Sequence, residues 1–183
     1  SEYLISPSII KNGNIRAKEE GIVAGLNLAE MVYYKFSDEI IFKKLVKDGD
    51  QIEYGQFLAE VKGPVIELLK AERIVLNFLQ RMSGIATRTD RYVKETIEYP
   101  AKIVDTRKTT PTLRILEKYA VICGGGNNHR MGLYDAVMIK DNHIKAVGGV
   151  IKAIEIIREK IPHTVKIEVE VEDIKGVEEA LAA

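Results

Sequence analysis

Apolar residues recur at helical spacing in two stretches of the first half of the chain. Residues 26–36 form one such stretch, which predicts a single amphipathic helix. Residues 71–98 form the second, but Ser83-Gly84 interrupts it, so we expect two helices that end before Tyr99-Pro100. The apolar stripe of the first of these two helices comprises Ile74, Val75, Phe78, Leu79 and Met82.

The residues before position 62 have the pattern of short strands. Glycines punctuate this region at loop-like intervals, and Asp48-Gly49 is a tight-turn signal between two partly apolar runs. We therefore expect a small sheet that is partly covered by the helix over 26–36. Residues 1–98 are assigned to an N-terminal α+β domain.

From residue 101 onward, short apolar runs alternate with helical patterns. Thr110 and Pro111 are typical of a helix start, as N-cap and first helical residue, and Val150 opens another helix that reaches residue 160. This alternation indicates an α/β fold with parallel strands joined by helical crossovers. The short apolar runs are 102–105, 121–123, 136–139 and 164–171.

The last of these runs alternates between apolar and charged residues. Three valines and an isoleucine at odd positions share one face of residues 164–171, and Lys166, Glu168 and Glu170 share the other. The charged face either lies in water or points into the lumen of a parallel barrel, where charges near the carboxyl end line an active site. The periodicity alone leaves both interpretations open.

Composition places the chain among ordinary globular proteins. Hydrophobic residues make up 46% and charged residues 30%, and 27 basic residues balance 27 acidic ones. The balance does not indicate a nucleic-acid or membrane partner, and no stretch approaches the ~18 apolar residues of a membrane span. No signal peptide is visible, so we expect a cytoplasmic protein. The single cysteine, Cys123, excludes an internal disulfide and is expected to be buried before a glycine turn.

Charge is unevenly distributed along the chain. Residues 102–145 carry eight lysines and arginines against four acids, whereas residues 166–179 carry two lysines against six acids. A basic segment beside an acidic one suits an anionic substrate that also needs a cation or a metal.

Cationic residues stand where the apolar runs and the glycine run end. Arg107-Lys108, His129-Arg130 and Lys140 have this position, and in a β/α barrel they would meet at one mouth. Arginine can bind a carboxylate or phosphate through two parallel hydrogen bonds, whereas lysine acts as a point charge. The glycines at 124–126 would leave backbone N–H groups free to approach an anion. The other histidines, His143 and His163, are expected to be structural or solvent-facing.

Several motifs together resemble the quinolinate phosphoribosyltransferase family, the nicotinate-nucleotide pyrophosphorylases. The resemblance covers nearly the whole chain, is most specific over residues 72–143, and is looser before residue 60. The motifs are Glu72-Arg73 with Leu76-Asn77, Ser83-Gly84-Ile85-Ala86-Thr87, Asp105-Thr106-Arg107-Lys108-Thr109, Gly124-Gly125-Gly126 with Asn128-His129-Arg130, Lys140-Asp141-Asn142-His143, and Ile167-Glu168-Val169-Glu170-Val171.

This resemblance implies a pentosyl transfer of NAD synthesis, in which quinolinate and phosphoribosyl pyrophosphate give nicotinate mononucleotide, pyrophosphate and carbon dioxide. It also implies Mg²⁺ and a homodimer or higher homo-oligomer, in which Arg73 reaches from one subunit into the barrel of its partner. Lys140 and Glu170 are then the expected catalytic residues, and Glu170 is a candidate magnesium ligand. Arg81 is expected to be plain helix surface. The expected substrate-binding residues are Arg73, Thr106, Arg107, Lys108, His129, Arg130, Lys140, Glu168 and Glu170.

The chain departs from this family's pattern in its length. A complete β/α barrel takes roughly 250 residues, so we expect residues 99–183 to form the first half of a truncated, incomplete barrel. Alone, such a chain would bind substrate weakly and would not turn over. Three alternatives stay open: a fold relative associated with molybdenum transport, a lipoyl- or biotinyl-carrier-like binding module, and a non-catalytic assembly fragment.

Overall fold

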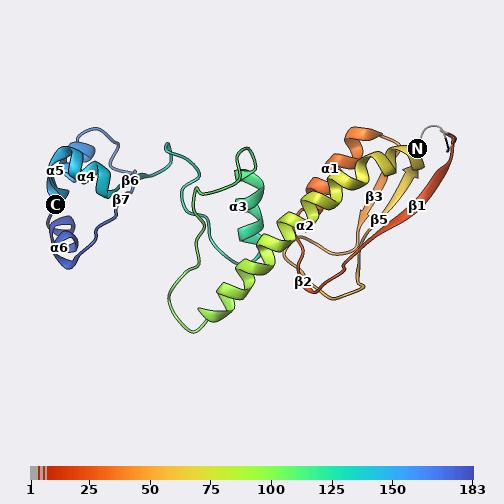
Figure 1. Cartoon of the computed structure of the whole chain (residues 1–183), viewed down its shortest axis with the longest axis horizontal. Helices are drawn as coiled ribbons and strands as arrows, with labels where there is room; N and C mark the ends of the chain where they lie inside the picture. The colour runs from red at the N-terminus through yellow and green to blue at the C-terminus, as the bar shows by residue number, and fades with distance from the viewer. Residues whose placement is uncertain (1–3, 5, 7) are drawn as a thin grey trace. The chain divides into compact units, whose positions relative to one another are not determined.

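The computed structural model describes residues 4, 6 and 8–183. They form two compact units, one up to His129 and one from Arg130 onward (Figure 1). This division differs from the expected domain boundary at residue 98, because residues 99–129 pack with the first unit; the boundary itself stays a prediction. In the part of the chain that the structure describes, no helix is long and apolar enough to cross a membrane.

Two small antiparallel sheets open the first unit, as the glycine-punctuated pattern predicts. The larger has the order β1 (Ile10–Arg16), β5 (Phe57–Pro64) and β3 (Ile41–Lys44). The smaller pairs β2 (Gly21–Ile22) with β4 (Gln51–Ile52). The expected turn at Asp48-Gly49 is confirmed, and Gly49 adopts a positive φ of 94° there.

Helix α1 (Leu26–Phe36) has the predicted bounds and packs with α2 against the larger sheet (Figure 1). Its residues Leu26, Ala29 and Tyr33 share one buried apolar cluster with side chains of the three strands and of α2. A helix of eleven residues is only marginally stable by itself. Burial of its apolar face in this cluster supplies the missing stability.

The prediction of two helices over 71–98 is wrong, because one helix, α2 (Val65–Glu95), runs for 31 residues. A glycine inside a helix costs about 1 kcal/mol relative to alanine. That cost at Gly84 is small beside the burial of Met82 and Ala86 on either side of it. The Ser83 hydroxyl also finds partners outside the helix, where it binds the backbone N–H of Ala24 at 3.0 Å.

Helix α3 (Arg114–Cys123) begins later than predicted. Residues 110–113 form a turn in which Thr112 has a φ of 69°, so Thr110 and Pro111 precede the helix and do not start it. The apolar run over 121–123, expected as a strand, is the last turn of this helix. Cys123, expected to be buried, is only partly buried, against the cluster that includes Met82 and Ala86.

The second unit contains one parallel pair of strands with helices between and after them. Strands β6 (Val137–Ile139) and β7 (Ile167–Val169) pair in register, joined through α4 (Asp141–Val147) and α5 (Val150–Arg158), and α6 (Ile174–Ala182) follows. The predicted strands at 136–139 and 164–171 and the helix at 150–160 are therefore confirmed, with shorter bounds. The core of this unit is formed by Ile139, Val150, Ala153 and Ile154.

The expected strand over 102–105 is reduced to a single parallel bridge between Val104 and Asn127. Mixed α/β content is thus shown, whereas a half-barrel stays a prediction.

The glycine after α3 generates a test of this packing. A Cβ on Gly124 would lie 2.2 Å from the carbonyl oxygen of Ala86 and 2.7 Å from Cβ of Thr89, so α3 can approach α2 only with glycine there. We expect Gly124→Ala to lower the free energy of unfolding by about 1–3 kcal/mol, as overpacking does.

Gly84→Ala is the matched control, because a Cβ at Gly84 meets nothing within 4 Å. We expect this variant to gain about 0.5–1 kcal/mol from helix propensity. Urea denaturation of both variants checks the prediction, and equal stability of the two would contradict the close approach of α2 and α3.

Candidate active site

The loop that carries Arg107 and Lys108 is held through its backbone. The Lys108 N–H donates to Thr106 Oγ1 at 3.0 Å. From α3, Arg114 donates through Nε to Thr109 Oγ1 at 3.1 Å and through Nη2 to the Arg107 carbonyl at 3.4 Å. The side chains of Arg107 and Lys108 have no ion-pair or hydrogen-bond partner among the described residues. This leaves two cations available on a loop whose course is fixed.

A buried ion pair lies directly behind this loop. Lys118 is 1% exposed and donates to Asp105 Oδ1. The same lysine donates to the carbonyl of His129 at 3.0 Å, and the His129 N–H donates to Asp105 Oδ1 at 2.9 Å. Both backbone groups of His129 are therefore held by one buried pair of charges.

The triple glycine does not offer free donors, contrary to expectation. The N–H groups of Gly124, Gly125 and Gly126 donate to the carbonyls of Ala120, Ile122 and Val121 at the end of α3. Gly125 adopts the left-handed conformation with φ of 82°. These glycines therefore close the helix, a common use of glycine at this position, and do not form an anion cradle.

Arg81, expected to be plain helix surface, forms a cross-link between α2 and α3. It pairs with Glu117 and also donates to Thr110 Oγ1, while Glu117 Oε2 accepts from the Thr110 N–H at 3.1 Å. Partial burial alone would raise the pKa of Glu117. The hydrogen bonds from Arg81 and Thr110 outweigh it and hold the pKa below its ordinary value.

Arg73 lies on the exposed surface of α2, two residues before the buried Val75. It has no hydrogen-bond or ion-pair partner among the described residues of its own chain. No contact within the described part of the first unit therefore explains why an arginine occupies this position.

In the second unit, the two expected catalytic residues are paired with each other. Lys140 follows β6 and Glu170 follows β7, and Lys140 Nζ lies 2.7 Å from Glu170 Oε2. The Glu170 N–H donates to the Ile139 carbonyl at 2.8 Å, which extends the strand pairing up to this ion pair. Both side chains remain substantially exposed, at 45% and 60%, so the pair is open to an arriving ion.

Two histidines have the predicted structural or solvent-facing positions. His143 caps helix α4, since its Nδ1 accepts from the Lys140 N–H at 3.0 Å and its N–H donates to the Lys140 carbonyl. This cap fixes the backbone on which Lys140 stands. His163 is exposed.

Arg130 stabilises the loop that leads to β6. Its Nη1 donates to the Ala136 carbonyl at 3.0 Å, and Asp135 accepts from two backbone N–H groups of the same loop. Glu168 lies on β7 on the exposed side of the strand, so the two-residue alternation of this segment is confirmed.

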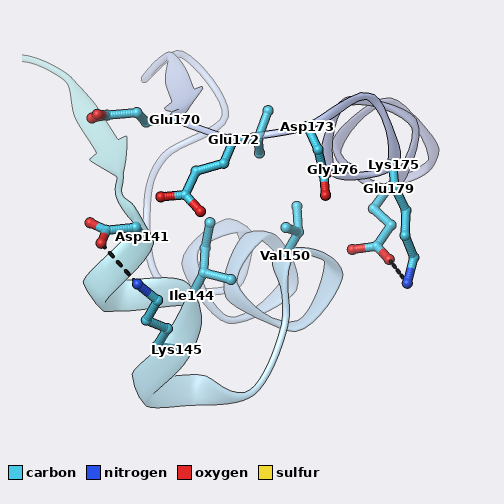
Figure 2. Close-up of a pocket in the computed structure, with 11 residues that line it drawn as sticks. Asp141, Ile144, Lys145, Val150, Glu170, Glu172, Asp173, Lys175, Gly176 and Glu179 are labelled. Carbon is cyan, nitrogen blue, oxygen red and sulfur yellow. Dashed lines mark hydrogen bonds and ion pairs between the residues drawn. The ribbon is translucent and has the colours of Figure 1, made fainter.

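An acidic pocket lies beside the Lys140–Glu170 pair (Figure 2). Two lysines at the pocket pair with carboxylates: Lys145 with Asp141 at 3.2 Å and Lys175 with Glu179 at 3.6 Å. Within the described part of the chain, no group of three or more acidic, histidine or cysteine side chains is arranged to hold a metal ion. The carboxylates that line the pocket are Asp141, Glu170, Glu172, Asp173 and Glu179.

The predicted site residues thus fall into two groups. Arg73, Thr106, Arg107, Lys108 and His129 belong to the first unit, and Arg130, Lys140, Glu168 and Glu170 to the second. That the cations of both groups meet at one mouth stays a prediction.

Sequence reasoning missed the residues of α3 that hold the loop. Arg114, Glu117 and Lys118 have the i, i+3, i+4 spacing that puts side chains on one helix face. This spacing indicates a polar helix face, but it does not by itself show whether that face is solvated or buried.

Comparison with known proteins identifies the family. Residues 2–83 match the family model described as the N-terminal domain of quinolinate phosphoribosyl transferase, and residues 85–183 match its C-terminal domain. The chain belongs to the quinolinate phosphoribosyltransferase family.

Relatives and solved structures agree. The chain is 48% identical over 169 residues to a probable carboxylating nicotinate-nucleotide pyrophosphorylase of Bacillus subtilis, covering 92% of this chain and 58% of the relative. It is 45% identical over 166 residues to the corresponding protein of Synechocystis, covering 91% and 56%. The crystal structure of NadC from Streptococcus pyogenes superposes with a TM-score of 0.95 at 45% identity, over 99% of this chain and 64% of that one. The chain therefore spans less than two thirds of the length of these relatives.

The Arg81–Glu117 cross-link generates a pH prediction. The pKa of Glu117 is lower in the folded chain than in the unfolded one, so its contribution to stability is complete above the unfolded pKa and is lost as the pH falls through the folded pKa. We expect Glu117→Gln to cost about 1 kcal/mol at pH 7, because Arg81 is partly exposed and the pair is screened.

The difference in free energy of unfolding between wild type and this variant should shrink as the pH falls below about 4.3, the ordinary pKa of glutamate, and through the lower pKa of Glu117 in the folded chain. Urea denaturation at a series of pH values measures it, with the exposed Glu98→Gln as control. A difference that persists unchanged at low pH would show that Glu117 acts without its charge.

Proposed function

We propose that the protein to which this chain belongs transfers the phosphoribosyl group of phosphoribosyl pyrophosphate to quinolinate, with loss of one carboxylate as carbon dioxide. Family membership supports this reaction, and two relatives at 46–47% identity are named decarboxylating quinolinate phosphoribosyltransferases. The observation that carries the proposal is the Lys140–Glu170 pair, which sets an accessible cation beside an accessible carboxylate.

The first unit supplies groups suited to the pyridine dicarboxylate. Quinolinate is a dianion, and the free guanidinium of Arg107 can bind one carboxylate through two parallel hydrogen bonds. Thr106, Lys108 and His129 are further donors, on backbone held by α3. Arg130, whose Nη1 binds Ala136, belongs to the same proposed set.

The second unit supplies groups suited to the transfer itself. Breaking the bond at the anomeric carbon builds positive charge on the ribosyl group, which a nearby carboxylate stabilises. Glu170 has this role in the proposal, with Glu168 in support, and Lys140 binds the phosphates or the second carboxylate. After transfer the positive charge on the ring nitrogen stabilises the carbanion that forms on the adjacent ring carbon when the carboxylate leaves as carbon dioxide. A proton then adds to that carbon, and no organic cofactor is needed.

Magnesium fits this set only together with the phosphates. Mg²⁺ usually binds through one or two carboxylates and substrate phosphate oxygens. The described residues offer Glu170 for this purpose but no ready-made metal cluster. When bound, the ion would neutralise charge on the pyrophosphate, while Lys140 and Glu170 orient the reacting groups.

The names of the relatives do not favour a role in molybdenum transport, and no observation favours a carrier module. Substrate binding distinguishes an enzyme from a fragment that only assembles, because only the enzyme is expected to bind quinolinate. The cytoplasmic location expected from the sequence also belongs to this proposal.

Replacing Arg107 tests the carboxylate site. Because its side chain has no partner among the described residues, Arg107→Ala should leave the fold intact. We expect quinolinate affinity to fall by about tenfold to a hundredfold, as for loss of hydrogen bonds to a charged group.

Calorimetry with quinolinate measures this change, and nicotinate, which lacks one carboxylate, should bind more weakly than quinolinate to the wild type. Arg158→Ala, an exposed arginine at the end of α5, serves as control. Equal affinity of the Arg107 variant and the control would remove Arg107 from the site, and absence of quinolinate binding to the wild type would contradict the function.

Mixing two inactive variants tests whether Arg73 serves a partner subunit. In the whole protein to which this chain belongs, Arg73→Ala and Glu170→Gln are each expected to abolish turnover. If Arg73 acts across a dimer interface, equal mixtures should recover about a quarter of wild-type activity, since half of the dimers are mixed and each has one intact site. Formation of nicotinate mononucleotide after subunit exchange is the measurement, and a mixture that stays inactive despite exchange would place Arg73 in its own subunit's site or outside it.

A further inference from the structure

The ion pair of Lys118 and Asp105 is buried more deeply than any other in the described part of the chain. The side chains are 1% and 8% exposed. Taking two charges out of water is expensive, and an apolar pair of similar size would often be equally stable. Stability alone therefore does not explain why a lysine and an aspartate occupy this place.

The geometry around the pair shows what an apolar pair would lose. Asp105 Oδ1 accepts from the His129 N–H at 2.9 Å, and Lys118 Nζ donates to the His129 carbonyl at 3.0 Å. Asn128, with its amide nitrogen turned toward them, donates to Asp105 Oδ2 at 2.7 Å and to the Lys118 carbonyl at 2.9 Å. Four hydrogen bonds thus hold the two residues before Arg130, and three of them use the charged side chains of the pair.

The same aspartate is also continuous with the loop of Arg107 and Lys108. The Asp105 N–H donates to the Asn127 carbonyl at 3.1 Å, and the Asn127 N–H donates to the Ile103 carbonyl at 2.8 Å. One buried charge pair thus couples the segment before Arg107 to the segment that ends in His129.

We propose that Lys118 and Asp105 are positioning residues, which act through the backbone of His129 and set where its imidazole meets the substrate carboxylate. Neither side chain touches the substrate, since both are buried. This inference rests on the proposed function, in which His129 binds quinolinate.

The double variant Asp105→Asn with Lys118→Met tests the proposal. It removes both charges together, so no unpaired charge is left buried, and the amide can still accept from the His129 N–H. The donor to the His129 carbonyl is lost. In the whole protein to which this chain belongs, we expect the KM for quinolinate to rise about tenfold or more, as for a small misplacement of a binding group, while the KM for phosphoribosyl pyrophosphate stays the same. Hydrogen exchange at the His129 amide should become faster.

Lys43→Met with Glu60→Gln is the matched control, because it removes an exposed pair of the same charges from the sheet. A quinolinate KM equal to that of the control, with unchanged exchange at His129, would overturn the proposal. If wild type itself fails to bind quinolinate, the proposed function falls, and the exchange rate at His129 alone decides whether the pair fixes its backbone. If the double variant does not fold, Asn128→Ala, a change at an exposed residue that frees Asp105 Oδ2, must raise the quinolinate KM, and no change there would overturn the proposal.

Discussion

One buried attraction between opposite charges links α3 of the first unit to the loop that carries Arg107 and Lys108. Lys118 on α3 reaches Asp105 at the start of this loop, and the two side chains are only 1% and 8% exposed. In such surroundings an unpaired charge would be very costly, so α3, the loop and the segment before Arg130 hold their arrangement together. The aligned contacts of Arg114 and Glu117 on the same helix face extend this attachment over one turn of the helix.

The candidate residues of the second unit rely on a different kind of support. Lys140 and Glu170 are exposed, and their positions come from the strand pairing behind them and from the histidine cap of α4. A charged side chain can leave its ion-pair partner and bind a ligand when it is accessible and its backbone is held in place. Lys140 and Glu170 have this arrangement. The candidate residues of the first unit are thus held by a buried ion pair, and those of the second unit by strand pairing and a helix cap.

The sequence predicted those elements whose pattern is local. Leu26–Phe36 was predicted to the residue, because its apolar face repeats at helical spacing and is buried accordingly. The strand and helix around Val150 were predicted for the same reason. The chemically distinctive residues were also recognisable, since motifs such as Asp105-Thr106-Arg107-Lys108-Thr109 are specific to one family.

What could not be predicted depends on contacts between distant parts of the chain. Ser83-Gly84 looked like a break because local propensity disfavours glycine, but neighbours in the sheet and in α3 keep the helix continuous. The glycines after Cys123 looked like an anion loop, because nothing in their sequence shows that the end of α3 uses their N–H groups. The burial of Lys118 was not predicted, because its partner Asp105 lies thirteen positions away along the chain and periodicity does not show such a contact.

The uninterrupted length of α2 limits which insertions and deletions the sequence can accept during evolution. Each helical residue turns the chain by about 100°, so one inserted or deleted residue would rotate everything beyond it. The helix therefore fixes the direction of Arg73 relative to that of Ser83 and Thr87, which bind the backbone of Ala24 and Ile22. Length variation can accumulate in the loops of this chain, but the long helix tolerates substitution only.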